Sequence, residues 1–76
     1  MGIGARVAEA RLEGGATQAQ LAATIGMDRT ALAKIESGSR GVSAVELVAI
    51  ARALGRRVEW FVDETPPALA SYRGAH

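Results

Sequence analysis

The chain of 76 residues contains no cysteine, and its single histidine is His76. The absence of cysteine excludes disulfide bonds and thiolate metal sites, and a single histidine cannot form a histidine-based metal or catalytic cluster. Aromatic residues are also scarce, and no apolar run approaches the roughly 18 residues that a membrane-spanning helix requires. The N-terminus lacks the basic segment and apolar core of a signal peptide, so we expect a cytoplasmic protein.

Charge is nearly balanced overall, with a net charge of +1, but it is distributed unevenly along the chain. Six basic residues lie between positions 29 and 57 against two acidic ones, whereas Glu59, Asp63 and Glu64 follow directly. This distribution predicts a basic face and an acidic face, although solvated helix surfaces produce the same pattern without any function. A chain of this length forms one small domain, which buries about 60% of its unfolded surface.

Apolar residues recur at intervals of three and four, the period of amphipathic helices, and no alternating strand pattern is present. Capping residues and closing glycines predict the helix ends. The chain is therefore predicted to be all-α, with residues 1–64 forming the domain and residues 65–76 forming a tail or linker that begins near two prolines. Five helices are expected: residues 3–13, one between Thr17 and Gly26, one between Asp28 and Gly38, one between Ser43 and Gly55, and a short one at residues 58–62.

Residues 17–38 contain two of these helices, each about two turns long and joined by a tight turn. Because helices this short are not stable alone, they must pack on the helices before and after them, which leaves one face of the second helix free. A helix fits the roughly 12 Å wide major groove of DNA and presents its N-terminal residues to the base edges. The segment is therefore typical of a helix-turn-helix.

Outward positions of the second helix carry the candidate base-reading residues. Long basic side chains can donate to the O6 and N7 atoms of guanine, and methyl groups can contact a thymine methyl. Each good bidentate pair discriminates between bases by about 1 to 3 kcal/mol, so the few side chains of one domain give weak sequence discrimination. We therefore expect a homodimer on a palindromic operator. The candidates are Arg29, Thr30, Ala33 and Lys34.

Phosphate contacts need donors at the groove margin or the free N–H groups of a helix N-terminus. Thr17 and Gln18 lie at the N-terminus of the first of the two helices, and Ser39 and Arg40 follow the second. We expect these four residues to orient the protein on double-stranded DNA without specifying a sequence.

The order and spacing of these elements resemble the bacterial and phage helix-turn-helix domains of the lambda repressor, Cro and XRE group. The matching parts cover about residues 3–62: the R-x-x-x-x-R of Arg6 and Arg11, TQAQLA, the turn IGMD, RTALAKIESG and LVAIARALG. The resemblance implies a five-helix lambda-repressor-like fold and a transcriptional regulator associated with DNA in the nucleoid. It also implies an ion pair between Arg11 and Glu36, which would make that carboxylate structural.

Several functions remain open at this point. The favoured one is a sequence-specific repressor, and an antitoxin that binds a toxin shares the same domain. A protein-interaction module without DNA contact would use Trp60 and the acidic residues around it. An enzyme is not expected, because no nucleophile–base pair, acid–base carboxylates or phosphate loop can be assembled, and neither a cofactor nor a metal is expected.

Trp60 has two interpretations. It caps the core beside Val58 and Phe61, or it lies exposed with Val62 as a self-association surface that Tyr72 could join. Residues 66–73 resemble the linker of longer regulators in which this domain precedes a zinc-peptidase-like domain. A C-terminal effector domain is therefore a further candidate partner, although the H-E-x-x-H motif of such a peptidase is absent from this chain.

Overall fold

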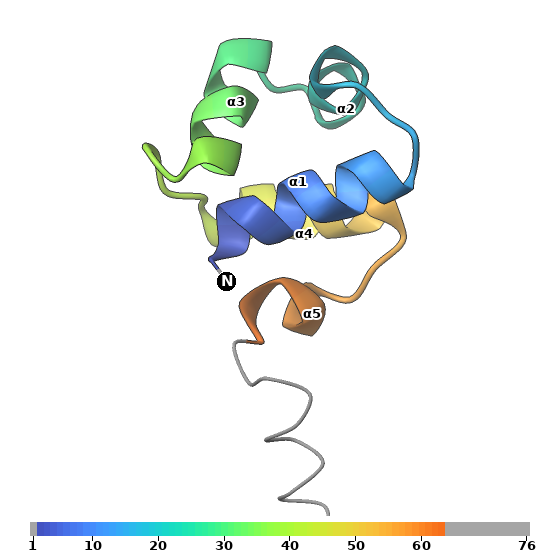
Figure 1. Cartoon of the computed structure of the whole chain (residues 1–76), viewed down its shortest axis with the longest axis vertical. Coiled ribbons are helices and arrows are strands. Elements are labelled where there is room, and N and C mark those ends of the chain that lie inside the picture. The colour runs from blue at the N-terminus through green and yellow to red at the C-terminus, as the bar shows by residue number, and fades with distance from the viewer. Residues whose placement is uncertain (1, 64–76) are drawn as a thin grey trace, which may run out of the picture.

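The computed structural model describes residues 2–63, and within that range every regular element is a helix (Figure 1). The all-α class and the five helices predicted from the sequence are confirmed. The expected tail, residues 65–76 with Tyr72, lies outside the described residues, as does Glu64. The helices are α1 (Ile3–Glu13), α2 (Gln18–Ile25), α3 (Arg29–Ser37), α4 (Ala44–Leu54) and α5 (Val58–Val62).

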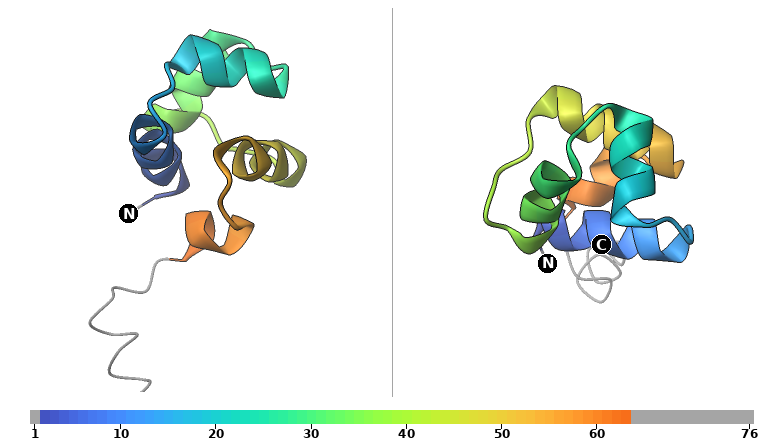
Figure 2. Two further views of the ribbon diagram at one scale, coloured as in Figure 1. Left: turned by 90° about the vertical axis from the view of Figure 1, so that its right-hand side faces the viewer. Right: turned by 90° about the horizontal axis from the view of Figure 1, so that it is seen from above.

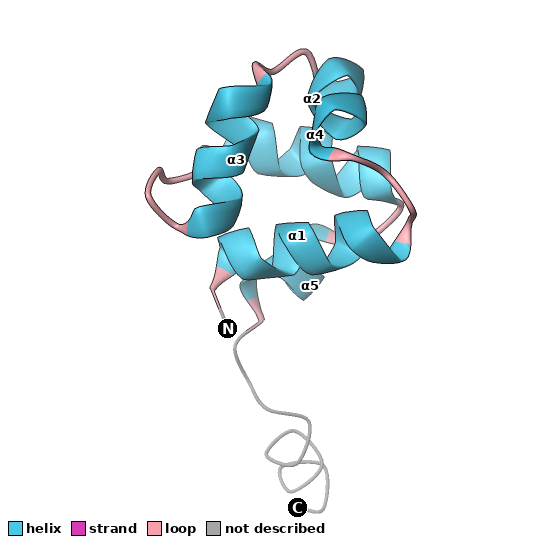
Figure 3. Ribbon diagram, turned by 45° about the horizontal axis from the view of Figure 1, so that its top comes forward, coloured by secondary structure: helices cyan, strands magenta, loops and turns pink. Residues whose placement is uncertain are grey.

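Local hydrogen bonds set the ends of the two short helices. At the start of α2, the Thr17 hydroxyl accepts from the Gln20 N–H at 3.0 Å, and Gln20 Oε1 accepts from the Thr17 N–H at 2.9 Å. At their C-terminal ends, Gly26 and Gly38 adopt left-handed conformations with φ of 69° and 83°, which residues with a Cβ rarely adopt. These caps confine α2 and α3 to about two turns each and leave only a short turn between them (Figure 3).

The helices form three levels, with α1 and α4 in the middle, α2 and α3 on one side and α5 on the other (Figure 2). Fully buried side chains from four helices meet between these levels: Val7, Leu32, Ile50 and Phe61. Burying a side chain of this size contributes about 1.5 to 3 kcal/mol relative to leaving it exposed. The core therefore supplies the stability that α2 and α3 lack as isolated helices.

A glycine sets the distance between α1 and α3. A Cβ atom on Gly4 would lie 2.0 Å from the carbonyl oxygen of Ile35, so only glycine allows the two backbones to come this close. Ile35 is buried and belongs to the last turns of α3. The N-terminal part of α1 therefore determines how far α3 stands from the rest of the domain.

None of the helices described between residues 2 and 63 has the length and apolar content needed to cross a bilayer.

Candidate nucleic-acid interface

The outward face of α3 is polar and largely accessible. Arg29, Thr30 and Lys34 are exposed, while Leu32 on the opposite side is fully buried. Ala33 is half-buried, so it is less accessible than the outward position predicted for it. Three of the four candidate base-reading residues are thus presented to solvent.

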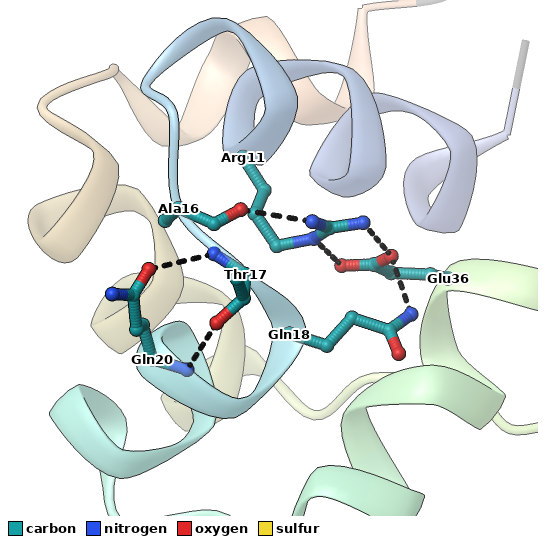
Figure 4. Close-up of polar contacts among 6 residues, drawn as sticks. All are labelled: Arg11, Ala16, Thr17, Gln18, Gln20 and Glu36. Atoms are coloured by element: carbon teal, nitrogen blue, oxygen red, sulfur yellow. Dashed lines mark hydrogen bonds and ion pairs between the residues drawn. The ribbon is translucent and has the colours of Figure 1, made fainter.

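A partly buried polar network connects α1, α2 and α3 behind this face (Figure 4). Arg11 Nε donates to Glu36 Oε2 at 2.8 Å, and Arg11 Nη2 donates to Glu36 Oε1 at 3.0 Å. The side chains of Arg11 and Glu36 are only 11% and 6% exposed, and this hydrogen bonding raises the pKa of Arg11 above its ordinary value. Arg11 Nη1 also donates to the carbonyl oxygen of Ala16 at 2.9 Å, so one guanidinium braces the connection between α1 and α2.

Gln18 joins the same network. Its Nε2 atom donates to Glu36 Oε1 at 3.0 Å, across 18 positions of sequence. The sequence predicts Gln18 at a phosphate and the family resemblance implies the pair of Glu36 with Arg11, but neither predicts a contact between Gln18 and Glu36. No local pattern signals it, because the contact depends on how α2 crosses α3.

Next to this network, the structure brings Thr17, Gln18 and Arg29 to the rim of one shallow hollow of about 560 Å³. The N-terminus of α2 opens onto this hollow, and its free N–H groups and helix dipole favour an anion there. The Thr17 hydroxyl itself is engaged as the N-cap of α2. The hollow is lined by Arg11, Leu12, Gly15, Ala16, Thr17, Gln18, Ala19 and Arg29.

On the far side of α3, the two remaining phosphate candidates lie on the connection to α4. Ser39 Oγ lies 3.0 Å from Ser37 Oγ, so the two hydroxyls pair at the end of the helix. Arg40 makes a bidentate contact with Glu46, from Nη2 to Oε2 at 2.9 Å and from Nη1 to Oε1 at 3.2 Å. These bonds, together with one from the Ser43 backbone N–H, lower the pKa of Glu46 to about 2. No local pattern in the sequence indicates that Arg40 reaches Glu46, six positions further along the chain.

Trp60 is half-buried and packs against the core. Its ring packs edge-to-face on Phe61, with centroids 5.1 Å apart, and two guanidinium groups lie against it. The guanidinium carbon of Arg56 is 4.2 Å from the ring centroid and that of Arg6 is 5.0 Å away. This packing agrees with the core-capping interpretation of Trp60, and the neighbouring Val62 is 46% exposed, so the self-association surface stays a prediction.

α4 carries an exposed apolar surface that the sequence analysis does not predict. Val45 is 81% exposed and Val48 is 38% exposed, and a hollow of about 370 Å³ lies beside them. The signal in the sequence was their position opposite the buried Leu47 and Ile50, where an amphipathic helix normally carries polar residues.

Known proteins agree with this geometry. A family model described as helix-turn-helix matches residues 7–61. A chain in the solved structure of a SinR protein/SinI protein complex is similar, with a TM-score of 0.80 and 27% sequence identity; the similarity covers 96% of this chain and 72% of that one. None of the curated proteins matches. With most of its length matched by the family model, this chain belongs to the XRE-type helix-turn-helix family of DNA-binding transcriptional regulators.

Proposed function

We propose that this protein is a non-enzymatic, sequence-specific repressor that binds a palindromic DNA operator as a homodimer. The observation that carries the proposal is the exposed row of Arg29, Thr30 and Lys34 on α3, next to the N-terminus of α2. In a helix-turn-helix, these are the positions that meet base edges and the flanking phosphates.

The residues divide into two roles in this proposal. Arg29 and Lys34 donate to guanine, and the methyl group of Thr30 contacts a thymine methyl, while the half-buried Ala33 contributes at the edge of the same surface. The phosphates are held by Thr17, Gln18, Ser39 and Arg40 from the two ends of the helix pair. Each good bidentate base contact discriminates by about 1 to 3 kcal/mol, so sequence preference depends mainly on Arg29 and Lys34.

A titration on DNA tests this proposal, once a binding site has been selected from random sequences. The logarithm of affinity should fall linearly with the logarithm of salt concentration, by roughly 0.9 per phosphate neutralised. Arg29→Ala should relax the preference at one base pair, whereas Gln18→Ala should weaken binding to all sequences alike. Arg57→Ala is the matched control, because it removes the same charge beside α5, on the far side of the domain from α3 (Figure 1). A flat salt response without a preferred site contradicts the proposal.

The homodimer is proposed because three exposed reading side chains in one domain give limited discrimination, and a two-fold operator doubles them. Sedimentation on a palindromic site and on a half-site measures the stoichiometry. Val62→Glu tests the surface beside Trp60, and Val45→Glu tests the exposed face of α4. A variant that weakens binding to the palindrome but not to the half-site identifies the surface through which the two copies contact each other. Binding of a single copy to the palindrome, with the affinity measured on the half-site, refutes the dimer.

A regulator controlled by a protein partner is the second candidate, and it is favoured by the similar chain, whose structure is a complex of two different proteins. Here the partner would be the toxin of a toxin–antitoxin pair or a C-terminal effector domain. A partner that releases DNA, and that still binds the Arg29→Ala variant, would support this candidate.

A further inference from the structure

The largely covered carboxylate of Glu36 determines where the amide of Gln18 lies. Glu36 Oε1 accepts from Gln18 Nε2 and from Arg11 Nη2, both at 3.0 Å, while Glu36 Oε2 accepts from Arg11 Nε at 2.8 Å. The Glu36 side chain is 6% exposed, so these bonds form where little water competes. Glu36, a residue of α3, therefore fixes the side chain of Gln18, the first residue of α2.

This contact allows only one orientation of the amide. A carboxylate has no hydrogen to donate, so Nε2 of Gln18 must face Glu36, and Oε1 turns away from it (Figure 4). The second N–H of Nε2 is then held in the amide plane at the N-terminus of α2, on the rim of the hollow that also includes Arg29. Arg11 balances the negative charge of Glu36, so the carboxylate does not repel a phosphate at this place.

We propose that Glu36 is a positioning residue for DNA binding, and that it acts by fixing the Gln18 amide for its phosphate contact. The inference rests on the proposed phosphate role of Gln18. An unrestrained glutamine loses its rotamer freedom on binding, whereas one already held by Glu36 has lost most of it in the free protein. Loss of this ordering should weaken binding by roughly two- to tenfold.

A double-mutant cycle measures the coupling. Affinity for the selected operator is determined by fluorescence anisotropy for the wild type, Gln18→Ala, Glu36→Gln and the double variant, at several salt concentrations. Both single variants should bind several-fold more weakly, and the double variant should bind no more weakly than Gln18→Ala alone, because Glu36 has no amide left to position once Gln18 is removed. Removing the Glu36 charge affects both backgrounds equally, so this effect cancels in the cycle.

A second variant covers the case in which Glu36→Gln does not fold. Glu36→Asp keeps the charge opposite Arg11 but is one methylene shorter, so it withdraws the oxygen from Gln18; melting curves establish that it is folded. The same cycle with Glu36→Asp should show the same coupling, and the side-chain amide NMR signal of Gln18 should move. Additive losses with whichever variant folds would refute the positioning role alone. Full affinity of Gln18→Ala would refute the phosphate contact, and the inference with it.

Discussion

Replacing Gly4 with alanine should destabilise the domain by forcing α3 away from α1. A Cβ atom at this position would lie 2.0 Å from the carbonyl oxygen of Ile35, 3.0 Å from its carbonyl carbon and 3.1 Å from the carbonyl oxygen of Glu36. All three neighbours are backbone atoms, so no side-chain rotation relieves the clash. The two helices would have to separate by about 1.5 Å to reach a normal contact distance of roughly 3.5 Å.

Two effects of opposite sign determine the size of this change. Overfilling a packed interior typically costs about 1 to 3 kcal/mol, and a contact between two backbones belongs at the upper end of this range or beyond. Alanine is favoured over glycine inside a helix by about 0.8 to 1 kcal/mol. We therefore expect a net loss of about 2 kcal/mol in the free energy of unfolding, and a fall in melting temperature of roughly 8 to 16 °C for a domain of this size.

Thermal and urea unfolding, followed by circular dichroism, measure this loss. Gly14→Ala is the matched control, because its Cβ would meet nothing closer than 3.5 Å and the φ of Gly14 is −80°. This control should be stabilised by about 0.4 to 1 kcal/mol through the reduced freedom of the unfolded chain. Gly4→Ala should also bind DNA more weakly below its melting temperature, since Ile35 and Glu36 belong to α3. A melting temperature at or above that of the wild type would refute the close approach of α1 and α3.

Three further substitutions test other parts of the structure. Because the hydrogen bonds from Arg40 and from the Ser43 backbone N–H lower the pKa of Glu46 from 4.5 to about 2, these contacts stabilise the fold above about pH 4.5, and this contribution is lost as the pH falls towards 2. Glu46→Gln should therefore be less stable than the wild type at pH 7, and this difference in the free energy of unfolding should be smaller at pH 3, as measured by urea unfolding. Thr17→Ala should cost about 1 kcal/mol through loss of the α2 cap, whereas Thr17→Ser should be nearly neutral in the same melting assay. Phe61→Ala should cost about 3 to 5 kcal/mol in urea unfolding, against less than about 0.5 kcal/mol for Val62→Ala at the next, exposed position.

The helices were predictable from the sequence because their ends depend on neighbouring residues. At α2, the reciprocal hydrogen bonds between Thr17 and Gln20 and the cap at the left-handed Gly26 join groups no more than four positions apart. A local pattern therefore contains all the information needed to predict these helix ends. The bond from Gln18 to Glu36 and the stacking of Arg6 on Trp60 join residues from different helices, and they depend on crossing geometry that no local pattern records.

Trp60 illustrates the same limit for a candidate interface. Its position on α5 does place it away from the inward-facing Val58 and Phe61, which is why an exposed ring was a reasonable expectation. The helical period predicts the direction of a side chain relative to its own helix. It does not predict which side chains of other helices will contact that side chain. Here α1 and the connection before α5 contribute Arg6 and Arg56, and these cover the ring from elsewhere in the chain.

The pairing of charges explains how a protein with a net charge of only +1 presents a basic surface to DNA. Both acidic residues between positions 29 and 57 are bound by arginines, Glu36 by Arg11 and Glu46 by Arg40, so neither acts as an isolated negative charge near α3. Among residues 2–63, Arg29 and Lys34 make no ion pair, and their charges remain available on the exposed face of α3. Charges within about 8 Å determine the local field at physiological salt. The location of the ion pairs, rather than the total charge, therefore sets the attraction of this surface for phosphate.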